Sequence, residues 1–209
     1  MIEPTKLILF MGVSWVLIVA PGPDMLYVIS RGMTQGRRAG MLSAVGVICG
    51  ILVHTTAAAF GLSLIFQTSA LAFLVVKYLG AAYLIYLGIK TWREKSTFSL
   101  QNSSLDVSFQ RVFWQGVLSN VFNPKIAIFF LAFLPQFVDK GSGHIPLQMV
   151  TLGLTFACFG LCFLLVIGYS SGTIGGWLVS QPRYAQFLQR LAAGILLGLG
   201  IRLALTERH

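Results

Sequence analysis

The sequence predicts an all-α membrane protein in which six transmembrane helices form an inverted 3+3 repeat, with the first and fourth helices broken. The first observation behind this prediction is composition. The 209 residues are 56% hydrophobic and only 10% charged, with a mean hydropathy of +0.80, and a bilayer is the solvent that suits such a surface. The second observation is that the apolar residues gather in six runs. The third is that matching runs in the two halves of the chain carry the same kind of interruption.

Each apolar run is long enough to cross the hydrocarbon core, which takes about 20 residues of α-helix. Segments of about ten residues with alternating polarity, typical of a transmembrane β-barrel, do not occur. The first run has no clear basic segment before it and no small-residue cleavage site after it, so we expect a retained span and not a signal peptide. The runs are 5–31, 39–66, 70–91, 112–135, 147–171 and 186–205.

The net charge of +9 is distributed unevenly over the connections between the runs. Nine basic residues lie in or beside the first–second, third–fourth and fifth–sixth connections, and four lie on the opposite side. Because cytoplasmic connections carry the excess of Lys and Arg, we expect these three in the cytoplasm and both termini outside. There is no soluble basic face with interleaved aromatic residues, so nucleic acid is not an expected partner. The nine are Arg31, Arg37, Arg38, Lys90, Arg93, Lys95, Arg111, Arg183 and Arg190, and the four are Lys6, Lys140, Arg202 and Arg208.

A polar segment, 93–111, divides the chain almost in half and has the Ser, Asn and Gln content of a linker. We therefore expect one polytopic domain, 1–209, with a first three-helix repeat at 1–92, a cytoplasmic linker at 93–111 and a second three-helix repeat at 112–209. Because each half holds an odd number of spans, a duplicated half enters the membrane upside down relative to its twin.

Pairs of glycines four residues apart are frequent in the remaining runs. Such pairs let membrane helices approach closely where no hydrophobic effect drives their association. Two interpretations stay open, tight packing within the chain or the face of a homodimer. The pairs are Gly46/Gly50, Gly168/Gly172, Gly172/Gly176 and Gly194/Gly198.

The first break is the sequence VAPGPDML, 19–26. Proline within a helix removes one backbone hydrogen bond and clashes with the carbonyl one turn back. Pro21, Gly22 and Pro23 together therefore predict an unwound stretch rather than a simple kink. Asp24 follows at the start of the resumed helix, where exposed N–H groups and the positive end of the helix dipole favour a carboxylate.

The second break is the sequence FNPKIAIFF, 122–130. Pro124 suits the first position of a helix, and Asn123 can cap that helix. Lys125 then lies at the end of the helix dipole that disfavours a cation, and Asp24 is the only acidic residue in any predicted span. If the halves are inverted repeats, the two breaks and their charges meet near the membrane midplane.

The charged breaks predict either a substrate site or a buried salt bridge that only joins the first span to the fourth. A zwitterion would suit such a site, with its carboxylate toward Lys125 and helix N–H groups and its ammonium toward Asp24 and unwound carbonyls. Two other ionisable residues lie within spans. His54 is a candidate proton carrier or site ligand, and equally a packing residue. Lys77 is a candidate second site residue, or it extends to the outer interface.

Three segments, APGPDML at 20–26, KYLGAAYLIYLGIK at 77–90 and NPKIAIFFLAFLPQF at 123–137, resemble the lysine exporter/homoserine–threonine resistance (LysE/RhtB) family of bacterial amino-acid exporters. The resemblance covers the whole chain. It implies a multi-pass protein of the bacterial cytoplasmic (inner) membrane that exports amino acids or close analogues, driven by the proton gradient. It places the family's two site motifs on Ala20–Asp24 and Asn123–Lys125. Through Asp24 the chain is more similar to the branch that exports neutral amino acids.

Three other functions are compatible with parts of the sequence. Broken helices with Asn-Pro starts also line passive channels for small polar solutes. A cation or metal exporter would need several acids or histidines in the spans, and the spans offer one of each. GYSSG at 168–172 matches the G-x-S-x-G motif, so an intramembrane serine protease could pair Ser170 with His54. Cys49, Cys158 and Cys162 lack the paired spacing of a zinc site, and we expect no metal, no cofactor and no enzymatic activity.

The charge asymmetry makes the topology testable. Single cysteines at Ser103 and at the C-terminus, treated with a membrane-impermeant thiol reagent in intact cells after replacement of the native cysteines, should show the second labelled and the first protected. A protected C-terminus that becomes reactive only on lysis would contradict either the orientation or the number of spans.

Overall fold

The computed structural model describes residues 2–62, 70–93, 108–139, 141, 143–180 and 182–205. Every regular element in these ranges is a helix, which confirms the predicted all-α class. The predicted linker, 93–111, falls mostly on residues 94–107, outside the described part. The helices are α1 (Pro4–Val19), α2 (Pro23–Gln35), α3 (Arg37–Ala57), η1 (Ala58–Leu62), α5 (Ala70–Arg93), α6 (Phe109–Val121), α7 (Pro124–Ile128), η2 (Phe129–Phe133), η3 (Leu134–Phe137), α8 (Ile145–Ser180) and α9 (Pro182–Leu205).

Both predicted breaks are present, and each bends its helix by a similar angle. The axes of α1 and α2 differ by 49°, and the axis of α6 differs from that of the segment Pro124–Phe137 by 47°. Prolines begin α2 and α7. Proline is tolerated at the first position of a helix, because an N–H group there would have no acceptor within the helix. Asn123 caps α7 by accepting a hydrogen bond from the backbone N–H of Lys125 at 3.0 Å. The prolines act locally, so both breaks follow from the sequence.

The described residues contain between three and five candidate membrane spans. Three helices among the described residues are long and apolar enough to cross a bilayer, Arg37–Gly61, Leu74–Arg93 and Ile145–Ser171, and there are five candidates if each bent pair counts as one span. The sixth predicted span, 186–205, lies within α9. The six-span count and the inverted repeat remain predictions.

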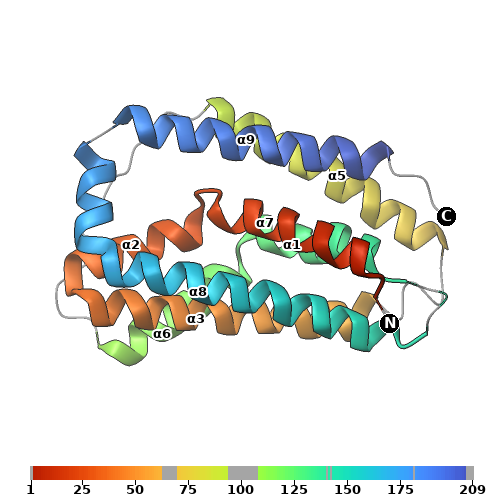
Figure 1. Ribbon diagram of the computed structural model, residues 1–209, viewed down its shortest axis with the longest axis horizontal. Helices are drawn as coiled ribbons and strands as arrows, with labels where there is room; N and C mark the ends of the chain where they lie inside the picture. Colours follow the sequence, from red (N-terminus) through yellow and green to blue (C-terminus); the bar gives the residue numbers. More distant parts are fainter. Residues whose placement is uncertain are drawn as a thin grey trace.

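The helices are arranged as a packed bundle with a helix pair along one side (Figure 1). In the bundle α3 packs against α6 and α8, and α2 packs against α3 and α8. The pair consists of α5 and α9, which lie side by side over much of their length. The start of α1 and the end of α9 lie at one end of the molecule, opposite the turn that joins α2 to α3 (Figure 1). We call these the termini end and the α2–α3 end.

Close glycine contacts hold the bundle together. A Cβ atom at Gly50 would lie 2.7 Å from Asn120 Cβ of α6, and one at Gly168 would lie 2.7 Å from the carbonyl carbon of Gly40. These glycines therefore serve internal packing. Nothing lies within 4 Å of a Cβ built at Gly194 or Gly198, so that pair leaves the homodimer prediction untested. The side-chain surroundings of Gly172 and Gly176 fall outside the described part of the structure.

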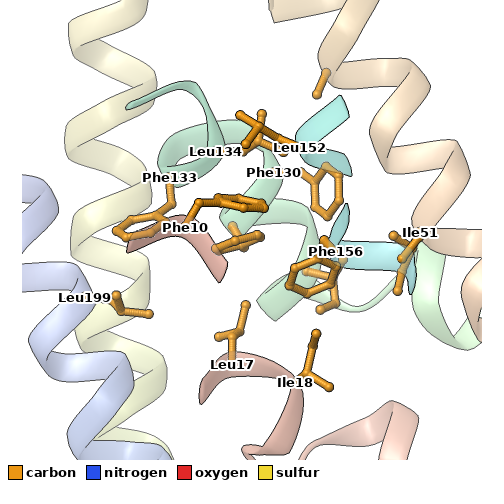
Figure 2. Close-up of a cluster of buried hydrophobic side chains, with 14 of the residues drawn as sticks. Phe10, Leu17, Ile18, Ile51, Phe130, Phe133, Leu134, Leu152, Phe156 and Leu199 are labelled. Atoms are coloured by element: carbon orange, nitrogen blue, oxygen red, sulfur yellow. The ribbon is translucent and has the colours of Figure 1, made fainter. Parts of the chain in front are cut away.

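Six phenylalanines pack together on the termini side of the two breaks, and we call them the phenylalanine cluster. None is more than 4% exposed. Ring centroids are 5.2 Å apart for Phe10 and Phe137, and 4.9 Å apart for Phe129 and Phe156. Part of the cluster belongs to η2, a short π-helix, and such segments are frequent at functional sites. Figure 2 shows several of its members among the other buried apolar side chains. The cluster consists of Phe10, Phe129, Phe130, Phe133, Phe137 and Phe156.

We expect Gly168→Ala to destabilise the fold by about 1–3 kcal/mol. The added methyl group would lie 2.8 Å from the Gly40 carbonyl oxygen and 2.9 Å from the Met41 amide nitrogen, and backbone atoms cannot rotate away. Gly198→Ala is the matched control, because its methyl group would meet open space and alanine favours a helix over glycine by about 0.5–1 kcal/mol. Thermal unfolding in detergent compares them. A melting temperature of Gly168→Ala equal to that of the control would contradict the close contact between α3 and α8.

Candidate functional site

The two breaks meet, and a carboxylate joins them. Asp24 lies in the first turn of α2, and its Oδ2 accepts hydrogen bonds from Asn120 Nδ2 at 2.8 Å and from Asn123 Nδ2 at 2.9 Å. Both asparagines belong to the other broken helix, Asn120 in the last turn of α6 and Asn123 at the cap of α7. All three side chains are buried. The first break is thus held by side chains that come from the second.

Lys125 makes the reciprocal contact. Its Nζ donates hydrogen bonds to the carbonyl oxygens of Leu17, at 3.2 Å, and Ala20, at 3.0 Å. These carbonyls end α1, where a helix leaves acceptors without intrahelical partners and where its dipole is negative. Gly22 suits this position, because a Cβ there would lie 3.0 Å from Lys125 Nζ. The ammonium is therefore stabilised by the end of another helix.

This arrangement corrects one expectation. Asp24 and Lys125 both lie where the two breaks meet, but they form no ion pair. Within the described residues the one ion pair joins Lys6 to Glu3 at 3.9 Å. Each charge is instead paired with neutral dipoles of the opposite break. The buried salt bridge that the sequence left open as a merely structural role is therefore absent from this conformation.

Two acceptors at the centre of the site have no donor. The second carboxylate oxygen of Asp24, Oδ1, and the side-chain oxygen of Asn120, Oδ1, are both buried without a hydrogen-bond partner. A buried polar atom without a partner costs about 1–3 kcal/mol. The two oxygens belong to one hydrogen-bonded pair of residues, and the oxygen of Asp24, which lines the cavity, suits a donor such as an ammonium group or a proton.

Asp24 and Lys125 line one cavity. Its volume is about 30 Å³, which is room for one or two water molecules and less than an amino acid needs. Asp24, Lys125 and backbone groups of the first break line one part of the cavity, and apolar side chains of α3 and α8 line another part. Binding of a larger solute requires the surrounding helices to move apart. The apolar wall includes Val47, Ile51, Phe156, Gly160 and Leu164.

The remaining predicted site residues take different places. Pro21, Pro23 and Pro124 shape the breaks. His54 reaches the site from α3, since its Nε2 lies 3.1 Å from the backbone oxygen of Asn120. Lys77, on α5, is 6% exposed, with its Nζ 5.1 Å from the centroid of the Tyr78 ring, and it is not among the residues that line the cavity.

Asn120 is the site residue that sequence reasoning missed. It is fully buried and contacts Asp24 through its amide and His54 through its backbone oxygen. The available signal was an asparagine inside an apolar run, three residues before Asn123 and therefore on nearly the same helix face. A neutral amide in a membrane helix indicates a functional site less strongly than a charged residue or a proline does.

Further hydrogen bonds tie α2 to α6 between the site and the α2–α3 end. Tyr27 donates its hydroxyl to the backbone oxygen of Val112 at 2.7 Å, and Arg31 Nη2 donates to Gln115 Oε1 at 2.7 Å. Arg31 is only 7% exposed. The two broken helices are thus joined at the breaks, and α2 and α6 are joined again farther from the breaks.

The protease interpretation is not supported by the arrangement of α3 and α8. GYSSG lies inside the continuous helix α8 and not at a strand–turn–helix elbow. Gly168 packs on Gly40, whereas His54 lies fourteen positions farther along α3, a separation of about 21 Å at 1.5 Å per residue. Ser170, two residues after Gly168, is therefore far from His54. For the metal alternative, no three His, Cys, Asp or Glu side chains gather within the described ranges.

Fold and site together define a class: a multi-pass membrane protein whose polar groups meet at two helix breaks inside an apolar bundle. Comparison with known proteins gives the family. The pattern of the LysE type translocator family matches residues 15–207. The chain belongs to this family of membrane transporters.

Curated relatives extend over nearly the whole chain. It is similar to the uncharacterized membrane protein YrhP of Bacillus subtilis, with 30% identity over 96% of this chain and 99% of the relative. It is also similar to an uncharacterized membrane protein of Vibrio cholerae, with 31% identity over 92% and 93%. The uncharacterized membrane protein PA4757 of Pseudomonas aeruginosa shares 28% identity over 93% and 92%. No solved structure matches the chain significantly.

The site geometry predicts a specific pattern of stability. Asp24→Asn and Lys125→Met should each lower the free energy of unfolding, because each removes one of two opposite buried charges together with its hydrogen bonds to the other break, and a buried group left without a partner costs about 1–3 kcal/mol. The double variant strands no charge, so its loss should be smaller than the sum of the two single losses. Thermal or denaturant unfolding of all four proteins in detergent measures the coupling. Strict additivity would show that the two charges do not interact.

Proposed function

We propose that this transporter exports amino acids or close analogues, neutral ones in preference, across the bacterial cytoplasmic membrane in exchange for protons. The observation that carries the proposal is the donor-free oxygen of Asp24, buried beside the cavity that Lys125 also lines. Membership of the LysE type translocator family supports transport, and the resemblance of the site motifs to those of amino-acid exporters supports the substrate class.

A zwitterion is complementary to the groups at the site. Its ammonium group suits Asp24 Oδ1, an acceptor without a donor on a residue that lines the cavity. Its carboxylate suits Lys125, because an ammonium side chain has three N–H groups and two are used on the carbonyls of α1. The opposite wall is apolar, and a second charge on the substrate would be desolvated there without a partner. These features favour neutral amino acids.

Exchange for protons follows from competition at one atom. Asp24 Oδ1 binds an ammonium group only while the carboxyl is ionised, because protonation converts this acceptor into a donor. Substrate and proton therefore exclude each other at Asp24, which is what antiport requires. His54 lies next to this residue through Asn120, and we assign it the role of delivering or accepting the proton.

The proposal includes the inverted repeat with both termini in the periplasm. The bends of 49° and 47° at the two breaks support equivalent first helices in the two halves, and the start of α1 and the end of α9 lie at the same end of the molecule (Figure 1). A carrier is favoured over a passive channel, because the cavity holds one or two water molecules and the packed phenylalanine cluster lies on its termini side.

Transport in vesicles tests the proposal. In inverted vesicles that hold the protein, a neutral amino acid should accumulate against its gradient while the pH gradient and membrane potential are maintained. Collapse of both should abolish accumulation. Undiminished accumulation would contradict proton coupling, and equilibrating flux alone would support a channel. If no amino acid or analogue moves, although the protein is present in the membrane, the substrate class is wrong.

The control variant for this experiment is the double variant Asp24→Asn/Lys125→Met, which should fold yet not transport. Transport by this variant at the wild-type rate would show that both residues are scaffold.

A further inference from the structure

One face of α8 forms much of the apolar wall of the cavity. Phe156, Gly160 and Leu164 all line it, and their spacing of four residues places them one above the other on the helix. The middle residue lets α3 pack closely against α8, because a Cβ at Gly160 would lie 3.2 Å from Ile48 Cδ1 and 3.6 Å from Ile51 Cδ1. The charged groups of the two breaks, Asp24 and Lys125, line the same cavity. A molecule held by these groups therefore projects its remaining atoms toward α8.

Phe156 is the largest of these three side chains and has a second set of neighbours. Its ring centroid lies 4.9 Å from that of Phe129 and 5.6 Å from that of Phe130. In Figure 2 its ring lies between Phe130 on one side and Leu17 and Ile18 on the other. It is 1% exposed. The ring thus separates the cavity from the rest of the phenylalanine cluster, and its neighbours leave it little freedom to turn aside.

We propose that Phe156 and Gly160 determine which substrate side chains are accepted, and that the accepted class is compact, uncharged and apolar. This inference rests on the proposed function. With the ammonium and carboxylate groups of the substrate fixed by Asp24 and Lys125, the position of its α-carbon is fixed as well. The side chain then meets the face of α8, where the ring of Phe156 limits its length and where Gly160 lets Ile51, which also lines the cavity, pack close to α8.

Two substitutions change this wall in opposite directions. Phe156→Ala removes a ring and lengthens the space for the substrate side chain, whereas the methyl group of Gly160→Ala takes up space beside the cavity and presses on Ile51, which lines it. One methylene group in an apolar pocket changes discrimination by about 10- to 200-fold. We therefore expect Phe156→Ala to raise the ratio of phenylalanine to alanine transport on the order of tenfold or more. Gly160→Ala should lower this ratio.

The matched control is Phe159→Ala. Phe159 lies one turn of α8 away, does not line the cavity, and packs its ring against Trp15 with centroids 6.2 Å apart. This substitution removes the same number of atoms as Phe156→Ala. It should change the transport rates of all substrates by the same factor. The experiment measures competition among alanine, leucine, phenylalanine and tryptophan for uptake into inverted vesicles that hold each full-length variant.

The ratio separates selectivity from damage to the fold, because a destabilised protein transports every substrate less. Opposite shifts in Phe156→Ala and Gly160→Ala, with none in Phe159→Ala, support the inference. Unchanged ratios, or shifts in the same direction, overturn it while leaving amino-acid export intact. If the wild-type protein transports none of the four or any analogue, the proposed function fails first. If Phe156→Ala does not reach the membrane, Phe156→Leu replaces it, and an unchanged ratio in that variant also overturns the inference.

Discussion

A helix inside a bilayer can be interrupted only if the backbone groups freed by the interruption find partners within the protein, and this constraint governs the centre of the molecule. The carbonyls of Leu17 and Ala20 at the end of α1 are satisfied by Lys125, which belongs to the second break. The carboxylate of Asp24 in the first break is held by Asn120 and Asn123, which flank the second. Each break is therefore stabilised by the other, and the two broken helices must lie together.

Close packing elsewhere positions these groups. Gly50 lets α6 approach α3 so closely that a Cβ there would lie 2.8 Å from the side-chain oxygen of Asn120. One turn farther along α3, His54 meets the backbone oxygen of the same asparagine. The contact of Gly40 with Gly168 sets α8 against α3, and α8 in turn supplies the apolar wall of the cavity. The glycines thus fix the geometry of the site although none of them carries chemistry.

The two sides of the cavity differ in chemistry. Toward the α2–α3 end, the halves of the broken helices are joined by hydrogen bonds from Tyr27 and Arg31. Toward the termini end, the phenylalanine cluster fills the space with apolar contacts, and part of it lies in the π-helix η2. Hydrogen bonds are directional and exchange readily with water, whereas the aromatic contacts depend on excluding water. Opening the cavity toward either end therefore breaks a different kind of interaction.

The sequence by itself determined the helical class, the position of both breaks and the presence of opposite charges at them. Proline and glycine act on the backbone next to them, and a membrane span is recognised by its length and polarity, so both signals are local. Only the tertiary structure decided which groups meet. Asp24 contacts residues 96 and 99 positions away, and no local pattern distinguishes an asparagine partner from the lysine that the charges favoured. Asn120 and Phe156 resemble ordinary residues of an apolar helix until α3, α6 and α8 are packed around the breaks. Their roles come from distances between helices, which packing sets and sequence spacing does not.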